Sequence, residues 1–225
     1  MKYSRLKFDY ARESLRYLVK IYNIKDIYIP YYLCDVIRHM LFEEGVKIHF
    51  YHIDDKFLPE KSMPEDCYLL YPNYFGICDK NVDILKKIYP NLIVDNAHSY
   101  YSEPQGFACF NAEHKFKSTD KGSYLWIKKE GSSIEDHTIE TFPLYKKENF
   151  IKLHKKYSSI NLLDIDLGCK SPFCYPLLVE TEDKANEIVK SLTKEGKTIY
   201  RYWNNLPKSY NEYKFYSRLI PIPLF

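Results

Sequence analysis

The stretch LIVDNAHSYYSEPQGFACFNAEHKF, residues 92–116, contains two apolar runs, and ionisable side chains follow each of them. Asp95 and His98 come after the run LIV, and Lys115 comes after the run ACF. Short, continuous apolar runs are typical of buried strands in a parallel sheet. Because strands commonly end in polar residues, one such side chain alone indicates no site. The three together make the ends of two predicted strands a candidate site.

Segments on either side of this stretch alternate between the periods of helices and strands. The spacing of apolar residues predicts helices over 13–23, 33–45 and 81–90. It predicts strands over 26–30, 46–52, 66–72, 91–97, 106–112 and 122–128. This alternation predicts an α/β fold, with a mostly parallel sheet that carries helices on both faces.

The character of the chain changes after about residue 130. Residues 128–150 are polar and weakly periodic, which indicates a connection that leads into a helix near 148–159. Beyond it the pattern predicts a strand over 173–181, a helix over 182–196 and a strand over 197–203. We therefore predict a large α/β domain over residues 1–145 and a small C-terminal α/β domain over residues 146–225.

Composition limits the classes of function. The net charge is only +3 in 225 residues and no basic block occurs, so we expect no nucleic-acid partner. No window approaches the roughly 18 apolar residues of a membrane span, and residues 1–14 lack the apolar core of a signal peptide. We therefore expect a soluble, cytoplasmic protein without a membrane partner.

Cysteine and histidine spacing does not favour a metal site. The six cysteines include no C-x-x-C pair and lie mostly in apolar surroundings, so we expect reduced thiols, with Cys34 packed at a helix start. His52, Asp54 and Asp55 could ligate a metal, but their segment is typical of a strand that leads into a solvated loop. We predict no metal site.

Ligands of parallel α/β sheets bind at the carboxyl ends of the strands. Tyr31 and Tyr32 follow the strand predicted over 26–30, and Asn73 follows the one over 66–72. If the strands are neighbours, these residues converge with Asp95, His98 and Lys115 on one crevice. An acid, a lysine and an aromatic ring are the groups that bind pyridoxal 5'-phosphate (PLP), where the lysine forms a Schiff base and the acid keeps the pyridine nitrogen charged.

The order of several motifs carries a resemblance. Residues 94–126, VDNAHSYYSEPQGFACFNAEHKFKSTDKGSYLW, resemble a D-x-A/T-H-S … S-L-R-K … D-G-G-x-L pattern of the DegT/DnrJ/EryC1/StrS aminotransferases, which have the fold-type I PLP architecture. Upstream, YIPYYLCDVI, VKIHFYHID and YLLYPNYFGICD resemble further segments of that family in the same order, and YARESL resembles its first helix start. CYPLLV, YRYWNNLP and RLIPIP resemble its small domain, although this chain is shorter than typical members.

The resemblance implies roles for particular residues. Lys115 would be the Schiff-base lysine, Asp95 the partner of the pyridine nitrogen, and His98 a contact of the ring. Tyr32, or Tyr31 as second choice, would lie over the ring. Backbone N–H groups near Arg12, Glu13 and Ser14 would hold the phosphate, and Asn73 completes the predicted cofactor site.

The same resemblance implies a substrate and an assembly. Family members are homodimers that mostly transfer an amino group from glutamate to a keto sugar carried on a nucleotide, commonly in polysaccharide biosynthesis, while some are dehydratases. Ala112 and Ala11 depart from the family pattern at the phosphate end, where a serine and a glycine are usual, and His114 replaces an arginine.

Two alternatives remain open from the sequence. The chain could be a catalytically degenerate PLP-fold protein that acts as a binding or assembly partner, or an unrelated α/β protein that binds a nucleotide sugar without PLP. Trp203 is compatible with a sugar pocket and with the core of the small domain. Lys117 and Lys121 flank Lys115 and are the rival candidates for its role.

Overall fold

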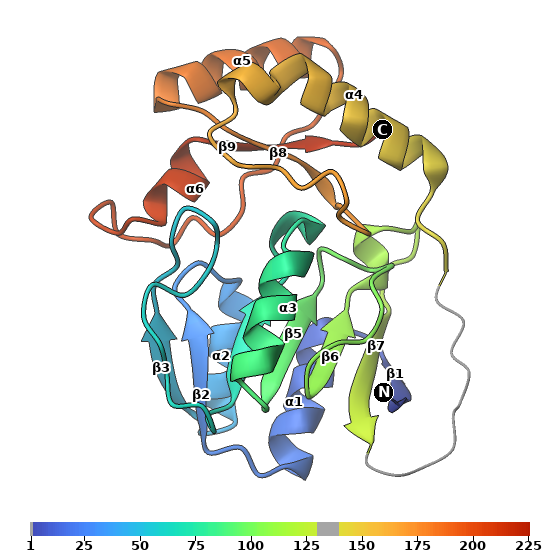
Figure 1. Cartoon of the computed structure of the whole chain (residues 1–225), viewed down its shortest axis with the longest axis vertical. Coiled ribbons are helices and arrows are strands. Elements are labelled where there is room, and N and C mark those ends of the chain that lie inside the picture. The colour runs from blue at the N-terminus through green and yellow to red at the C-terminus, as the bar shows by residue number, and fades with distance from the viewer. Residues whose placement is uncertain (1, 130–139) are drawn as a thin grey trace.

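The computed structural model describes residues 2–129 and 140–225. Its main sheet contains seven strands in the order β1-β7-β6-β5-β4-β2-β3. The strands are β1 (Lys2–Phe8), β2 (Asp26–Pro30), β3 (Lys47–Tyr51), β4 (Leu69–Pro72), β5 (Leu92–Asn96), β6 (Ala108–Asn111) and β7 (Ser123–Lys129). Helices α1 (Ala11–Ile21), α2 (Asp35–Glu43) and α3 (Asp79–Ile88) pack against it (Figure 1).

Strand direction confirms the predicted mostly parallel sheet. Strands β2 to β6 pair in parallel, whereas β7 runs antiparallel to both of its neighbours, β6 and β1. The carboxyl ends of β4, β5 and β6 therefore lie at one edge of the sheet. The chain leaves β6 at this edge, forms the short 3-10 turn η2 (Glu113–Lys115) and returns along β7.

Alternation along the strands explains why helices cover both faces. Leu70 and Ile93 pack with the apolar residues of α1 and α2, while their neighbours Tyr71 and Val94 pack with those of α3. Successive side chains of a strand point to opposite faces, so a continuous apolar run supplies two cores. The helices on both faces confirm the predicted layer arrangement.

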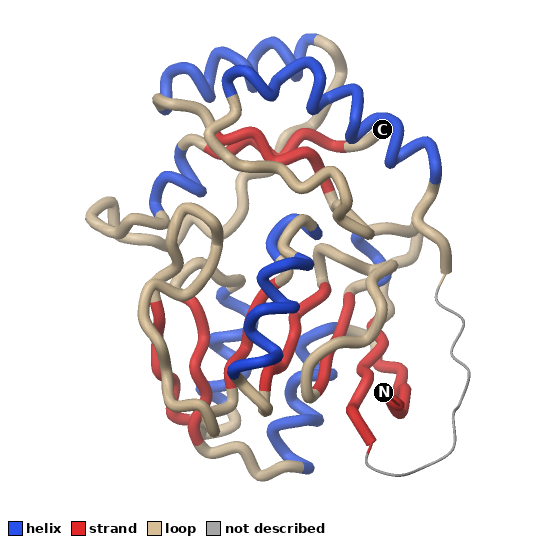
Figure 2. The backbone as a smooth tube through the Cα atoms, in the orientation of Figure 1, coloured by secondary structure: helices blue, strands red, loops and turns tan. Residues whose placement is uncertain are grey.

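A second, two-stranded sheet lies beyond the carboxyl edge of the first (Figure 2). It pairs β8 (Cys174–Leu178) with β9 (Leu219–Pro223), and α4 (Leu144–Tyr157), α5 (Glu182–Lys194) and α6 (Tyr213–Ser217) accompany it. Its buried residues belong to the same apolar cluster as those around α3. The proposed boundary between residues 145 and 146 stays a prediction, because one core crosses it.

One predicted strand is wrong, and two strands of the structure were not predicted. The strand predicted over 197–203 is wrong: these residues form no ladder, and Trp203 adopts a left-handed φ of 57° that a strand excludes. Strands β1 and β9 were not predicted, because charges interrupt the first and prolines interrupt the second. Residues 130–139 of the predicted polar connection lie outside the described residues. No described helix is long and apolar enough to cross a membrane.

Candidate active site

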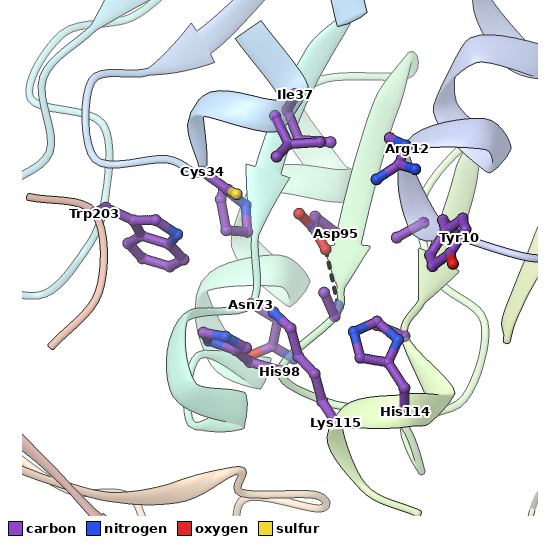
Figure 3. Close-up of a pocket in the computed structure, with 15 residues that line it drawn as sticks. Tyr10, Arg12, Cys34, Ile37, Asn73, Asp95, His98, His114, Lys115 and Trp203 are labelled. Atoms are coloured by element: carbon purple, nitrogen blue, oxygen red, sulfur yellow. Dashed lines mark hydrogen bonds between the residues drawn. The ribbon is translucent and has the colours of Figure 1, made fainter. Parts of the chain in front are cut away.

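A cavity of about 280 Å³ lies where β4, β5 and β6 end and α1 and α2 begin (Figure 3). Asp95, His98 and Lys115 all line it, although they come from three different segments. The starts of α1 and α2 face it because the helices follow strands of the same parallel sheet. The crevice predicted from the strand ends therefore exists, with these three residues together.

Asp95 stands near the end of the central strand β5, between Pro72 of β4 and Phe110 of β6. It is 9% exposed, and its Oδ1 accepts a hydrogen bond of 2.8 Å from the backbone N–H of Ala97. Burial raises the pKa of the Asp95 carboxyl, while the positive charge of Lys115 opposes that shift. A cationic group placed against this carboxylate would favour its ionised form.

Lys115 ends the turn η2, which follows β6 directly. Burial lowers the pKa of its amine from 10.5, and the neighbouring Asp95 and, to a smaller extent, Cys34 oppose that shift. The turn is fastened by Glu113, whose N–H donates to Gly122 O over 2.8 Å and whose carboxylate pairs with Lys117 Nζ at 3.1 Å. These contacts hold the turn that carries Lys115. Burial favours the neutral form of its amine more than an exposed position would.

The ring of His98 is stacked with two other aromatic rings. Its ring lies 4.6 Å from Phe173 at 7° and 5.5 Å from Trp203 at 12°, centre to centre. The side chain is 3% exposed, and burial, with a further contribution from Lys115, lowers its pKa well below 6.5. Among the described residues, no hydrogen-bond partner reaches its buried Nε2. His98 is therefore a neutral ring with an unused polar atom.

The start of α1 forms another wall of the cavity through Tyr10, Ala11 and Arg12. The first N–H groups of a helix have no partner within it and carry its positive dipole end, so this wall suits an anion. The Arg12 guanidinium lies 4.4 Å from the Tyr10 ring centre. Ser14 is placed differently: it is fully buried, its hydroxyl bonds that of Ser123 at 2.8 Å, and it does not line the cavity.

The remaining predicted residues divide into two groups. Asn73 lines the cavity, where its amide donates to Asp79 Oδ1 over 2.9 Å. Tyr31 and Tyr32 do not line it. Tyr32 is fully buried and donates its hydroxyl to Phe215 O over 3.1 Å, while Tyr31 stacks on Phe50 at 4.9 Å. Neither tyrosine therefore borders the cavity in which the cofactor ring was expected.

Trp203, Cys34 and His114 line the cavity without having been assigned to it. Trp203 comes from the irregular segment before α6 and reaches the cavity through a positive φ, for which the sequence gives no signal. Cys34 was expected to pack at a helix start; it is the N-cap of α2 and also faces the cavity. The sequence contained a signal for this placement, because Cys34 follows shortly after the strand predicted over 26–30.

Features of the cavity fit the predicted PLP cofactor. The α1 start suits a phosphate, Asp95 is a buried carboxylate suited to a ring nitrogen, and Lys115 supplies an amine. The orphaned Nε2 of His98 offers a polar contact to a ring substituent. Ala112 lines the wall without a hydroxyl, so a phosphate would depend on backbone N–H groups and Arg12.

Comparisons with known proteins agree with this fold. No family model and no curated protein matches the sequence. Solved structures do match: PseC of Helicobacter pylori, an aminotransferase involved in the biosynthesis of pseudoaminic acid, has a TM-score of 0.72 at 15% identity over 97% of this chain and 81% of that chain. The PLP form of a protein described as a sugar aminotransferase from Streptococcus pneumoniae has a TM-score of 0.71 at 14% identity over 98% and 81%.

A DegT DnrJ EryC1 StrS aminotransferase from Brucella abortus likewise has a TM-score of 0.72 at 11% identity, over 98% of this chain and 81% of that chain. At these identities the likeness establishes the fold. The resemblance read from the motifs is confirmed at that level: the chain has the fold of the DegT/DnrJ/EryC1/StrS-type aminotransferases, and the match spans 81% of the length of these solved chains.

Proposed function

We propose that this protein is a PLP-dependent aminotransferase that acts on a nucleotide-linked keto sugar, with Lys115 as the Schiff-base lysine. The observation that carries the proposal is the meeting of Lys115, Asp95, His98 and the α1 start in one cavity. The solved structures with this fold include one protein described as a sugar aminotransferase and one described as an aminotransferase involved in the biosynthesis of pseudoaminic acid, which supports the substrate class.

Each residue has a role that follows from its surroundings. When bound, PLP supplies an electron sink for the charge that forms at a substrate carbon when a proton leaves it. The Asp95 carboxylate would bind the ring nitrogen, and the α1 start with Arg12 would bind the phosphate. Because burial lowers the pKa of Lys115, its Nζ is better suited than an exposed amine to accept a proton and return it.

The neutral ring of His98 would orient the cofactor rather than exchange protons with it. Its lowered pKa keeps the ring uncharged, and its stack with Phe173 and Trp203 fixes the ring plane. Asn73 is held by Asp79 and would support the same wall. By the resemblance to the family, we extend the proposal to glutamate as amino donor and to a homodimer.

An absorbance titration with PLP tests the proposal. We expect a visible band on addition of PLP that borohydride removes, with mass spectrometry then locating the reduced cofactor on Lys115. Lys115→Ala abolishes the band. Lys121→Ala is the matched control, because Lys121 lies in the same loop but is exposed and paired with Asp9 at 2.6 Å.

Two results would contradict the proposal. A band that persists unchanged in Lys115→Ala would place the cofactor elsewhere. No band with the unaltered protein would favour a binding or assembly role for a degenerate PLP fold instead.

A further inference from the structure

A second cavity of about 300 Å³ adjoins the first, and among the described residues only Lys115 lines both. Its other walls come from Phe116 of the same loop, Lys146 at the start of α4, the β8–β9 sheet and residues 198–202. Lys115 therefore borders two compartments. The first has the groups that fit a cofactor, which leaves the second as the other described access to this lysine.

The linings of the two compartments differ in charge. The first contains the carboxylate of Asp95 together with two cations, Arg12 and Lys115. The described lining of the second contains two lysines, Lys115 and Lys146, and no acidic side chain. A pocket lined by cationic side chains without acidic ones favours negatively charged ligands. The second compartment therefore suits a negatively charged ligand, in addition to the phosphate that the α1 start of the first compartment suits.

Lys146 occupies a position that is unfavourable for a cation without a partner. It lies half-buried in the first turn of α4, at the positive end of the helix dipole, with its Nζ 5.7 Å from the centre of the Phe116 ring. No carboxylate of the described chain lies within 4.0 Å of it, and burial lowers its pKa. Lys117, two positions after Lys115, instead contacts Glu113 and Glu140.

Flat side chains form much of the remaining wall. Phe116, Phe173, Tyr200 and Tyr202 all line the second cavity, together with Pro221 and Pro223. Aromatic faces bury flat apolar surface, and tyrosine adds a polar hydroxyl. Such a wall accommodates the carbon skeleton of a substrate whose charged group reaches Lys146.

We infer that the second cavity is the substrate compartment of Lys115, and that Lys146 selects substrates with a negative charge remote from the reacting carbon. This inference rests on the proposed function, because it assigns a substrate to the same lysine. It makes Lys146 a specificity-determining residue that acts on donors and acceptors alike, since both must reach Lys115.

L-Glutamate and L-glutamine test the inference, because they differ by one remote charge. Each is added to the PLP-loaded protein, and the loss of the visible band is followed against amino acid concentration. We expect Lys146→Gln to raise the half-saturating concentration of L-glutamate by about 10-fold, the size of one charge-assisted contact, and to leave that of L-glutamine unchanged. Lys146→Arg should restore the preference.

Lys152→Gln is the matched control, because Lys152 lies on the same helix but is exposed and lines neither cavity. An equal response of Lys146→Gln and Lys152→Gln to L-glutamate would overturn the inference while the Lys115 band still supports the proposed function. A bound cofactor that neither amino acid converts would also overturn it. Absence of the band in the unaltered protein would defeat the proposed function, and the inference with it.

Discussion

His98 shows how burial at a single residue controls the pH dependence of stability. Its folded-state pKa is far below 6.5, the value of an exposed histidine. Between these two values the unfolded chain binds a proton that the folded chain does not, so stability contributed by neutral His98 is present above pH 6.5 and is lost on acidification below it.

We predict that His98→Phe reduces the acid sensitivity of folding. Phenylalanine is flat enough to keep the stack with Phe173 and Trp203 but does not titrate. Below pH 6.5 the free energy of unfolding should fall more steeply in the wild type, by up to about 1.4 kcal/mol per pH unit. Urea unfolding at several pH values checks this. Equal slopes in both proteins would show that another group carries the acid sensitivity.

Gly76 controls how the turn after β4 packs on the segment that leads to β8. It has φ of 70°, and a Cβ there would lie 2.2 Å from Ser171 O and 2.4 Å from His98 O. Both neighbours are backbone atoms and cannot rotate away. Next to it, Phe173 N donates to Phe75 O over 2.8 Å. The close approach of these elements is possible only without a side chain.

We predict that Gly76→Ala destabilises the fold more than Gly45→Ala. Gly45 has nearly the same φ, 67°, but nothing lies within 4 Å of its hypothetical Cβ, so it isolates the backbone strain of about 1–2 kcal/mol. Gly76→Ala should cost about 1–3 kcal/mol more, as overpacking does. Chemical denaturation of the two variants provides the measurement. Equal losses would mean that the segment at Ser171 shifts freely.

The elements that sequence reasoning found and missed differ in their surroundings. Buried strands such as β5 are continuous apolar runs, and both faces of the sheet require that pattern. The edge strand β1 contains Arg5 and Lys7, and β9 contains two prolines, which an outer strand tolerates. Residues 197–203 have strand propensity, but they pair with no described strand and instead line the two cavities, which depends on tertiary structure.

The candidate site was predictable to the extent that sheet geometry determines it. Parallel strands bring their carboxyl ends to one edge, so Asp95, His98 and Lys115 could be placed together before the fold was known. The position of Trp203 could not be predicted in this way, because Trp203 is far from His98 in the sequence. The two rings meet only when the C-terminal segment folds over the carboxyl edge of the sheet. Tyr32 was expected to line the cavity, but it packs against Trp203, with ring centres 4.5 Å apart.

At the scale of the whole molecule, one of the two apolar cores extends from the main sheet into the C-terminal elements. A single apolar cluster includes residues around α3 and residues of β8, β9 and α5. A buried polar contact reinforces it: Glu212, fully buried, accepts hydrogen bonds from His52 Nδ1 at 3.0 Å and from Ile53 N at 2.9 Å. Shared burial of this kind favours one cooperative transition over two.

We therefore predict that residues 1–145 and 146–225 unfold together. The two tryptophans lie in different parts, Trp126 in β7 and Trp203 before α6, so Trp203→Phe leaves a probe of the sheet and Trp126→Phe leaves a probe of the C-terminal part. Urea midpoints from fluorescence should match those from circular dichroism within each variant. Glu212→Ala, added to either, should lower both midpoints, because it leaves Ile53 N without its acceptor. A C-terminal probe that unfolds before the circular dichroism signal would instead establish residues 146–225 as an independent domain.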